Sequence, residues 1–320
     1  MKRVSKATLV IRPGEGFVER RPGLKRAAAE LARAYAFNKL VTDEWLEKIG
    51  DALWAGLSEE NPDLQTELTT VRRKAGTRIL PVVIESEDAA VQRLPWELLK
   101  HPEFGFLGRE EGFTLWRRIP AEPMEEDEPE KGPLRVVMFT ALPDDGDWFT
   151  ELGDDAGAGT ARLKVEEQQA LALEALGEAI ADGTVLLRMP DDGRFSTFET
   201  LIKEFQPHVV FIFMHGKFYD EPYQKEAPYA VLQFEAEDGS SEEVRGERFA
   251  KAFYGSAVQA VVLAACESGM ASSEALTSGL AWRLNEMGIP QVVGMQKGTG
   301  TLPHWITRST TPPTKTTTAT

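Results

Sequence analysis

The sequence has little cysteine, little histidine and no phosphate-binding loop, and each shortage excludes a class of protein. With one cysteine among 320 residues, no disulfide can form within the chain. The four histidines and the cysteine do not cluster as zinc ligands do, so we expect no metal. No glycine-rich loop ends in Lys followed by Ser or Thr, so we expect no nucleotide and no other cofactor.

The chain also lacks membrane-type segments and an excess of positive charge. The apolar run at residues 7–11 is shorter than a signal-peptide core, and no run approaches the roughly 20 residues that span a bilayer. The formal net charge is −15, so the field around the molecule repels nucleic acid and anionic lipid. We therefore expect a cytoplasmic protein with neither nucleic acid nor a membrane as a partner.

The first part of the chain mixes strand and helix patterns. Strand-like runs are predicted at residues 7–12 and 78–84, and apolar residues recur at helical spacing between residues 24 and 57. A hairpin-like region follows at residues 106–116. The run 121–133 is rich in Pro and Glu and too polar to pack, which indicates a linker.

Beyond this linker, strand and helix patterns alternate regularly. Strands are predicted at residues 134–141, 185–189, 209–214, 230–234, 258–265 and 291–295, and helices at 166–181, 197–205, 246–253 and 274–287. Several strand runs are continuously apolar, which is typical of strands covered on both faces. The alternation predicts an α/β fold with a mostly parallel sheet flanked by helices.

These patterns divide the chain into four parts. We expect an N-terminal half over residues 1–120, the acidic linker over 121–133, a second half over 134–296 and a disordered tail, rich in Thr and Pro, over 297–320.

The single cysteine and one histidine each stand directly after a predicted apolar strand. Cys266 follows the run 258–265, and His215 follows the run 209–214. Catalytic groups collect at the carboxyl ends of parallel strands, so the thiol and the imidazole converge if these strands are neighbours. A histidine can take the proton of a thiol, whose thiolate is the nucleophile. Gly216 has no side chain, and its N–H and that of Cys266 could form an oxyanion hole.

Purely structural roles for the cysteine and the histidines compete with this catalytic interpretation. A lone cysteine after an apolar strand is usually a small core residue, but a His-Gly pair at the matching strand end reverses that balance. His208, behind Pro207, is expected to be a surface or capping histidine, while His101 and His304 fall in predicted loops.

One tryptophan, Trp96, and two glutamates, Glu97 and Glu267, also need an interpretation. We expect the indole of Trp96 in the core and the carboxylate of Glu97 on buried backbone N–H groups. A carboxylate at Glu267 disfavours a standing thiolate beside it, so we expect proton transfer at the moment of attack. We expect Glu267 itself to help shape the substrate pocket.

Five segments together resemble the CHAT family, a caspase-related group in the clan of caspases, separase and gingipains. They lie, in the family's order, at residues 94–99, 214–216, 244–250, 264–269 and 288–296. The resemblance spans residues 7–296. It implies a caspase-haemoglobinase fold in which a degenerate, pseudo-peptidase-like N-terminal half supports a catalytic half, with His215 and Cys266 as the dyad.

The chain departs from the family's pattern after Gln296. Relatives usually continue through an acidic residue, further helices and a final strand, whereas residues 309–320 match nothing in the family. We therefore expect little activity from the isolated chain, or a partner segment that covers the edge beside residues 291–295.

The leading functional hypothesis is a cysteine endopeptidase that hydrolyses peptide bonds of a restricted protein target. The resemblance implies an activating protein partner and a role in bacterial defence or cell death. A non-catalytic pseudo-peptidase, acting as a scaffold or interaction module, is the alternative. A metabolic enzyme with a similar sheet is disfavoured because no phosphate loop or cofactor motif is present.

Overall fold

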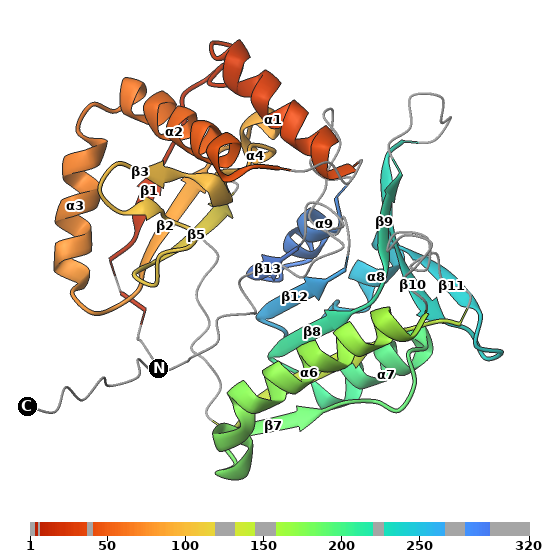
Figure 1. Ribbon diagram of the computed structural model, residues 1–320. Helices are drawn as coiled ribbons and strands as arrows, with labels where there is room; N and C mark the ends of the chain where they lie inside the picture. Colours follow the sequence, from red (N-terminus) through yellow and green to blue (C-terminus); the bar gives the residue numbers. More distant parts are fainter. Residues whose placement is uncertain are drawn as a thin grey trace, which may run out of the picture.

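The computed structural model describes residues 4–5, 7–36, 41–118, 132–144, 158–219, 227–265 and 279–294. Most of the predicted linker, the whole predicted tail, Cys266 and Glu267 lie outside these residues. The described residues build two separate hydrophobic cores. One core draws its buried residues from Leu9 to Phe113, and the other from Val137 to Ile289. Figure 1 shows the corresponding groups of helices and strands.

The N-terminal core lies around a parallel sheet of three strands in the order β1-β2-β5. The central strand, β2, is buried along almost its whole length because it has a neighbour on each side. The strands are β1 (Leu9–Ile11), β2 (Leu80–Glu85) and β5 (Phe113–Arg118), with a small antiparallel pair, β3 (Lys100–His101) and β4 (Gly105–Phe106). The helices are α1 (Pro22–Ala36), α2 (Asp43–Glu60), α3 (Leu64–Ala75), α4 (Ala89–Gln92) and the 3-10 turn η1 (Trp96–Leu98).

This half differs from the sequence expectation in two places. The helical pattern at residues 24–57 belongs to two helices, α1 and α2, and a third helix, α3, was not predicted. The predicted hairpin at residues 106–116 is wrong, since β5 pairs in parallel with β2 while β4 pairs with β3. Helix α3 gave little signal because only Leu64, Leu68 and Ala75 of its residues are buried.

The second core surrounds a five-stranded sheet in which every pair of neighbouring strands is parallel. The strand order is β13-β12-β8-β6-β7, as expected from the alternating strand and helix patterns. Its strands are β6 (Leu134–Thr140), β7 (Val185–Arg188), β8 (Val209–Phe213), β12 (Ala260–Ala264) and β13 (Gln291–Val293). The helices are α6 (Ala158–Ala181), α7 (Phe195–Phe205), α8 (Gly246–Lys251) and α9 (Leu280–Glu286).

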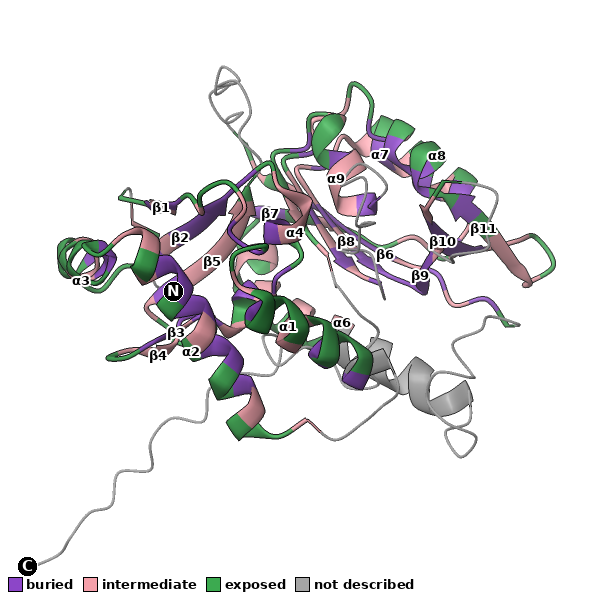
Figure 2. Cartoon of the chain, turned by 90° about the horizontal axis from the view of Figure 1, so that it is seen from above, coloured by how far each residue is buried: buried purple, intermediate pink, exposed green. Residues whose placement is uncertain are grey.

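Helices cover both faces of this sheet. Phe139 packs edge-on against Phe198 of α7, with ring centroids 5.0 Å apart. The hydroxyl of the next residue, Thr140, accepts a hydrogen bond from Gln169 of α6. Because successive side chains of a strand point to opposite faces, α7 and α6 lie on opposite sides of the sheet. Figure 2 shows buried residues along the strands and exposed residues on the outward sides of the helices.

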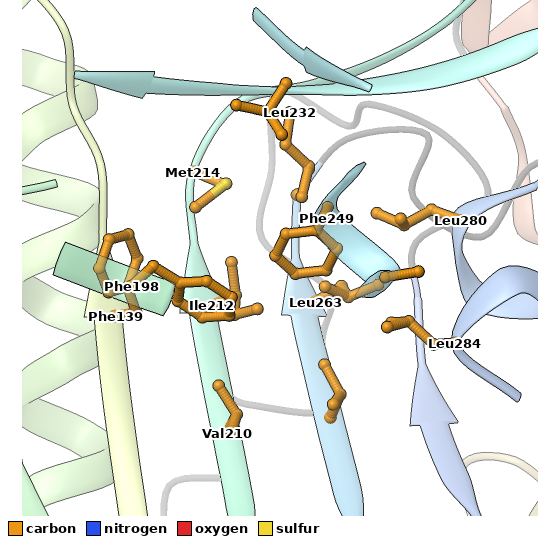
Figure 3. Close-up of a cluster of buried hydrophobic side chains, with 14 of the residues drawn as sticks. Phe139, Phe198, Val210, Ile212, Met214, Leu232, Phe249, Leu263, Leu280 and Leu284 are labelled. Carbon is orange, nitrogen blue, oxygen red and sulfur yellow. The ribbon is translucent and has the colours of Figure 1, made fainter. Parts of the chain in front are cut away.

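A second, antiparallel sheet lies beyond the carboxyl ends of β8 and β12. It contains β9 (Gly216–Tyr219), β10 (Tyr229–Glu235) and β11 (Ser241–Arg245), in the order β11-β10-β9. Figure 3 shows Leu232 of β10 above the ends of the parallel strands, with Met214, Ile212 and Leu263 below it. Leu232 and Ile212 are fully buried, so the same core joins the two sheets.

Candidate active site

The two strands that precede His215 and Cys266 are neighbours. Strands β8 and β12 pair in parallel over their whole length, from Val209 opposite Ala260 to Phe213 opposite Ala264. His215 follows Phe213 by two residues, and Cys266 follows Ala264 by the same number. The chain therefore leaves both strands at the same edge of the sheet, at equal offsets from the last pair. Cys266 itself lies outside the described residues.

Buried residues fix the chain just before each of these two positions. Met214 is 6% exposed and Ala265 is 1% exposed, and both belong to the core that α7, α8 and α9 share. Because these side chains are held in a close-packed interior, the backbone at both strand ends has little freedom. Met214 and Ala265 are the last apolar residues of the runs that form β8 and β12, and this is why they lie in the core.

His215 occupies the corner where the chain leaves the parallel sheet and enters the antiparallel one. Its side chain is 7% exposed, and it lies between the end of β8 and the start of β9. The His215 carbonyl accepts a hydrogen bond of 3.0 Å from the backbone N–H of Gln233 in β10. This hydrogen bond to β10 fixes the backbone of His215 just after the end of β8.

The backbone N–H of Gly216 points away from the antiparallel sheet. Gly216 lies opposite Leu232, one step beyond the hydrogen-bonded pair of His215 and Gln233. In an antiparallel ladder, hydrogen-bonded and non-hydrogen-bonded pairs alternate, so Gly216 directs its N–H away from β10. Strand β9 lies at the edge of this sheet. An oxyanion donor needs an N–H of this kind, free of the ladder and with no side chain in front of it.

A carboxylate holds the neighbouring loops at the same edge of the parallel sheet. Glu235, at the end of β10, accepts hydrogen bonds of 2.9 Å from the backbone N–H groups of Leu142 and Gly193. A Cβ atom on Gly193 would lie 2.6 Å from the Cα of Ala141, so only glycine fits there. The segments after β6 and before α7 are therefore packed tightly beside the candidate site.

Gln233 is a residue near the site that the sequence analysis did not single out. It lies within the apolar strand β10 and is only 3% exposed. A polar side chain in the middle of an apolar strand is unusual, because burial of an amide is costly. That interruption of the run 230–234 is the signal that could have identified it.

The other described histidines lie away from the carboxyl ends of β8 and β12. His208 precedes β8, at its amino end, and its Nδ1 accepts a hydrogen bond of 3.1 Å from the backbone N–H of Arg135, as a capping histidine does. The loop interpretation of His101 is wrong, because His101 lies in β3 and is fully buried in the N-terminal core. Its ring packs against Trp54 and Phe104, at centroid distances of 4.5 and 4.7 Å.

The segment around Trp96 was predicted correctly for one residue and wrongly for the next. Trp96 is fully buried, and its indole N–H donates to the carbonyl of Val91 over 2.8 Å. The carboxylate of Glu97 does not accept from buried backbone N–H groups as expected. It pairs instead with the guanidinium of Arg117, 2.7 Å away, because β5 brings that side chain beside η1.

Among the described residues, no group of three or more His, Cys, Asp or Glu side chains could hold a metal ion. No helix in the described part of the chain has the length and apolar character needed to cross a membrane.

Comparison with protein families agrees with the fold. The family model described as the CHAT domain matches residues 44–301, which is more than half of the 320 residues. No curated protein gave a significant match. The match covers α2, both sheets of the second core and the strands on either side of His215. The chain therefore belongs to the CHAT domain family, whose fold is caspase-like and whose wider group is a superfamily of peptidases.

Proposed function

We propose that this protein is a cysteine endopeptidase with Cys266 as its nucleophile and His215 as its general base. The parallel pairing of β8 with β12, in register up to Phe213 and Ala264, is the observation that supports this most strongly. It directs two chain segments to one sheet edge, and each segment carries one member of a thiol–imidazole pair.

The first half of the proposed reaction forms an acyl-enzyme. The Cys266 thiol gives its proton to the imidazole of His215 as the sulfur attacks the carbonyl carbon of the scissile peptide bond. The carbonyl oxygen becomes negatively charged and accepts hydrogen bonds from the N–H groups of Gly216 and Cys266. When the carbon–nitrogen bond breaks, His215 returns the proton to the leaving amine, and a thioester remains on Cys266.

The second half hydrolyses the thioester. His215 removes a proton from a water molecule, whose oxygen attacks the thioester carbonyl, and the same N–H groups stabilise the oxyanion. The carbon–sulfur bond breaks, the carboxylic acid product leaves, and the proton returns from His215 to the sulfur of Cys266. We propose that Glu267, next to the nucleophile in the sequence, lines the substrate pocket.

Membership of the family supports a proposal about the biological setting. We propose that the enzyme cuts a restricted protein target and that a protein partner activates it, within bacterial defence or cell death. Partner activation would explain how a peptidase is kept from cleaving other proteins. The competing function is a non-catalytic pseudo-peptidase that acts as a scaffold or interaction module.

The experiment uses the fact that the chain contains one cysteine. A mixture of peptidyl acyloxymethyl ketones, which alkylate catalytic thiols, is incubated with the protein, and the added mass is followed with time. Because the proposed enzyme requires a partner for full activity, we expect slow but measurable addition at Cys266, none in Cys266→Ala, and a still slower rate in His215→Asn. His208→Asn, at the other end of β8, is the matched control and should be labelled as fast as the wild type. If His215→Asn and His208→Asn react equally with the probe, the proposed dyad is wrong.

A further inference from the structure

Gln233 stands directly opposite the candidate general base. The register of β9 and β10 pairs Leu232 with Gly216, so the next step along the ladder pairs Gln233 with His215. The 3.0 Å hydrogen bond from the Gln233 N–H to the His215 carbonyl agrees with this pairing. Side chains of directly opposed residues lie on the same face of a sheet, with Cβ atoms about 5 Å apart. Gln233 is therefore the residue opposite His215 across the ladder, with its side chain on the same face.

The side-chain oxygen of Gln233 is buried and accepts no hydrogen bond from any described residue. Gln233 is 3% exposed, and among the residues that the structure describes no donor reaches its Oε1. An unpaired buried amide oxygen costs about 1–3 kcal/mol, so it is rarely kept without a reason. An unpaired oxygen such as Oε1 of Gln233 can accept a hydrogen bond from a group that becomes a donor only during the reaction.

The proposed reaction creates such a donor. When the imidazole of His215 takes the thiol proton, both ring nitrogens carry hydrogen. One N–H faces the substrate or the leaving group, and the other needs an acceptor that keeps the ring in place. In Cys-His peptidases and related enzymes a neighbouring acceptor of this type fixes the orientation of the ring.

The other polar groups nearby on this face do not fit the role. Glu243 on β11 lies opposite Gln233 on the side away from His215, is exposed, and already accepts from the hydroxyl of Tyr219. Lys217, two residues along β9, carries only donors. Glu235, two residues along β10, already accepts from Leu142 and Gly193. Gln233 is thus the acceptor that the sheet register offers to His215.

We propose that Gln233 is the positioning residue of the active site, whose side-chain oxygen accepts a hydrogen bond from the His215 imidazolium as the thiol proton is transferred. This inference rests on the proposed function. It assigns the orienting role to a neutral amide, so the stabilisation of the imidazolium comes from a dipole and not from a full negative charge.

The first test replaces the amide with a side chain of similar shape. Gln233→Met removes the acceptor, and Gln259→Met makes the same change at an exposed position at the amino end of β12. A hydrogen bond to a charged group corresponds to a factor of roughly 10–100 in rate. We expect Gln233→Met to slow the maximal rate of Cys266 labelling by that factor at an unchanged half-saturating probe concentration, and Gln259→Met to label at the wild-type rate.

Thermal unfolding separates positioning from a structural role. Because Oε1 accepts no hydrogen bond, its loss should leave the melting temperature unchanged or slightly raised. A melting temperature that falls in parallel with the labelling rate would overturn the inference in favour of a structural role. Equal labelling of Gln233→Met and wild type would also overturn it.

The second test restores an acceptor with a negative charge. Gln233→Glu should recover most of the labelling rate and move the acid limb of its pH profile to higher pH, because a carboxylate favours the imidazolium. The other charged groups on this face, Lys217 on β9, Glu235 on β10 and Glu243 on β11 opposite Gln233, are the same in both proteins, as is Glu267 after the nucleophile in the sequence. An acid limb that does not move would contradict contact between the residue 233 side chain and the imidazole.

The same set of proteins distinguishes failure of this inference from failure of the proposed function. If wild type reacts faster than His215→Asn while Gln233→Met equals wild type, the dyad stands and only the role of Gln233 is wrong. If wild type and His215→Asn react at the same rate, the dyad is wrong and the role of Gln233 is lost with it.

Discussion

At the residue scale, the buried His101 makes the stability of the protein depend on pH. Its Nδ1 accepts hydrogen bonds from the backbone N–H groups of Glu103 and Phe104, at 3.0 and 3.3 Å. Burial of the ring lowers the pKa of His101 below its ordinary value of 6.5, and the nearby Glu103 carboxylate offsets only part of this effect. Protonation would also turn Nδ1 from an acceptor into a donor that faces two other donors.

The sign of this dependence follows from the lowered pKa. As the pH falls through 6.5, the unfolded chain binds a proton at His101 before the folded chain does. The stability contribution is therefore complete above pH 6.5 and is lost as the pH falls toward the folded pKa. We expect the titration of His101 alone to change the free energy of unfolding by at most about 1.4 kcal/mol per pH unit.

The variant His101→Asn tests this slope by urea unfolding at several pH values. Asparagine can still accept the backbone N–H groups two and three residues on but cannot be protonated. We expect a less stable protein whose unfolding free energy changes little between about pH 7 and 5.5. If the variant keeps the wild-type slope, the titrating group is not His101.

The nucleophile allows a second prediction at this scale. Replacement of Cys266 by Ala should abolish probe labelling and proteolysis while the free energy of unfolding falls by less than about 1–2 kcal/mol, since a thiol that serves chemistry contributes little packing. Circular dichroism and chemical unfolding measure the stability. A variant that unfolds, together with an unreactive wild-type thiol, would identify Cys266 as a core residue.

The sequence predicted the candidate dyad but not its surroundings. His215 and Cys266 could be found because each ends a continuous apolar run, and a run of that kind predicts a buried strand with its end at a sheet edge. The pairing of Gln233 with His215 depends on the register of two strands that are separated by a long connection. A single sequence carries no information on such a register. The polar interruption of an apolar run could have marked Gln233, but nothing in the sequence could have placed it opposite His215.

At the scale of secondary-structure elements, one glycine sets the approach of α2 to the strand β3. A Cβ atom at Gly50 would lie 2.3 Å from the carbonyl oxygen of Leu98 and 2.8 Å from the Cβ of Lys100. Figure 1 shows α2 packed beside β3 in the N-terminal half. The backbone cannot come this close with any side chain between helix and strand.

Two Gly→Ala substitutions with opposite outcomes test this packing. Gly50→Ala should lower the free energy of unfolding by roughly 2–4 kcal/mol because backbone atoms must move. Gly177→Ala, in α6, meets nothing within 4 Å and should raise it by up to about 1 kcal/mol through helix propensity. Chemical unfolding of both variants gives the comparison, and a neutral Gly50→Ala would contradict the close approach.

A carboxylate joins the carboxyl ends of the three N-terminal strands. Glu85 ends β2, is 7% exposed and accepts hydrogen bonds from Arg12, just after β1, and Arg118, at the end of β5. Burial raises the pKa of Glu85, but the two guanidinium groups lower it further, so the net pKa lies below the ordinary value of 4.5. The ion pairs therefore stabilise the fold above that pH and lose their effect as the pH falls through the folded pKa.

Glu85→Gln should lower the free energy of unfolding at neutral pH by about 1–2 kcal/mol, since both arginine side chains are partly exposed and water screens them. Glu87→Gln makes the same change at an exposed position two residues on and should have little effect. Urea unfolding at pH 7 and again at a pH far enough below 4.5 that the folded carboxyl group is also protonated checks both. A difference between wild type and Glu85→Gln that persists at the lower pH would contradict the role of the carboxylate.

The elements that sequence patterns identified are the ones with long apolar runs. Strands β6, β8 and β12 were found because their apolar runs are continuous, with one face buried and the other at least partly covered in most positions. Strands β9 and β11 were missed because they are short, alternate with charged residues and lie at the edges of their sheet. Single-sequence periodicity is weakest for strands of that kind.

At the scale of the whole molecule, the described residues form two cores that share no residue. Leu53 is fully buried in the N-terminal core, and Phe198 is fully buried in the second. Truncation to alanine costs roughly 2–5 kcal/mol in a packed core. In calorimetry we expect two unfolding transitions. Leu53→Ala should lower the midpoint temperature of one, and Phe198→Ala should lower the midpoint temperature of the other. One transition that both variants shift equally would show that the cores unfold together.

The central claim is that the fold brings residues 215 and 266 together at one sheet edge, and formation of a disulfide tests it without any assumption about activity. In His215→Cys, the new thiol and Cys266 are the only two in the chain. A disulfide requires Cα atoms about 4.4–6.8 Å apart, close to the spacing of neighbouring strands. After mild oxidation, we expect the native His215→Cys protein to form this bond within the monomer, while His208→Cys, at the amino end of β8, forms none. Failure of His215→Cys to form it, or equal formation in both variants, would contradict the claim.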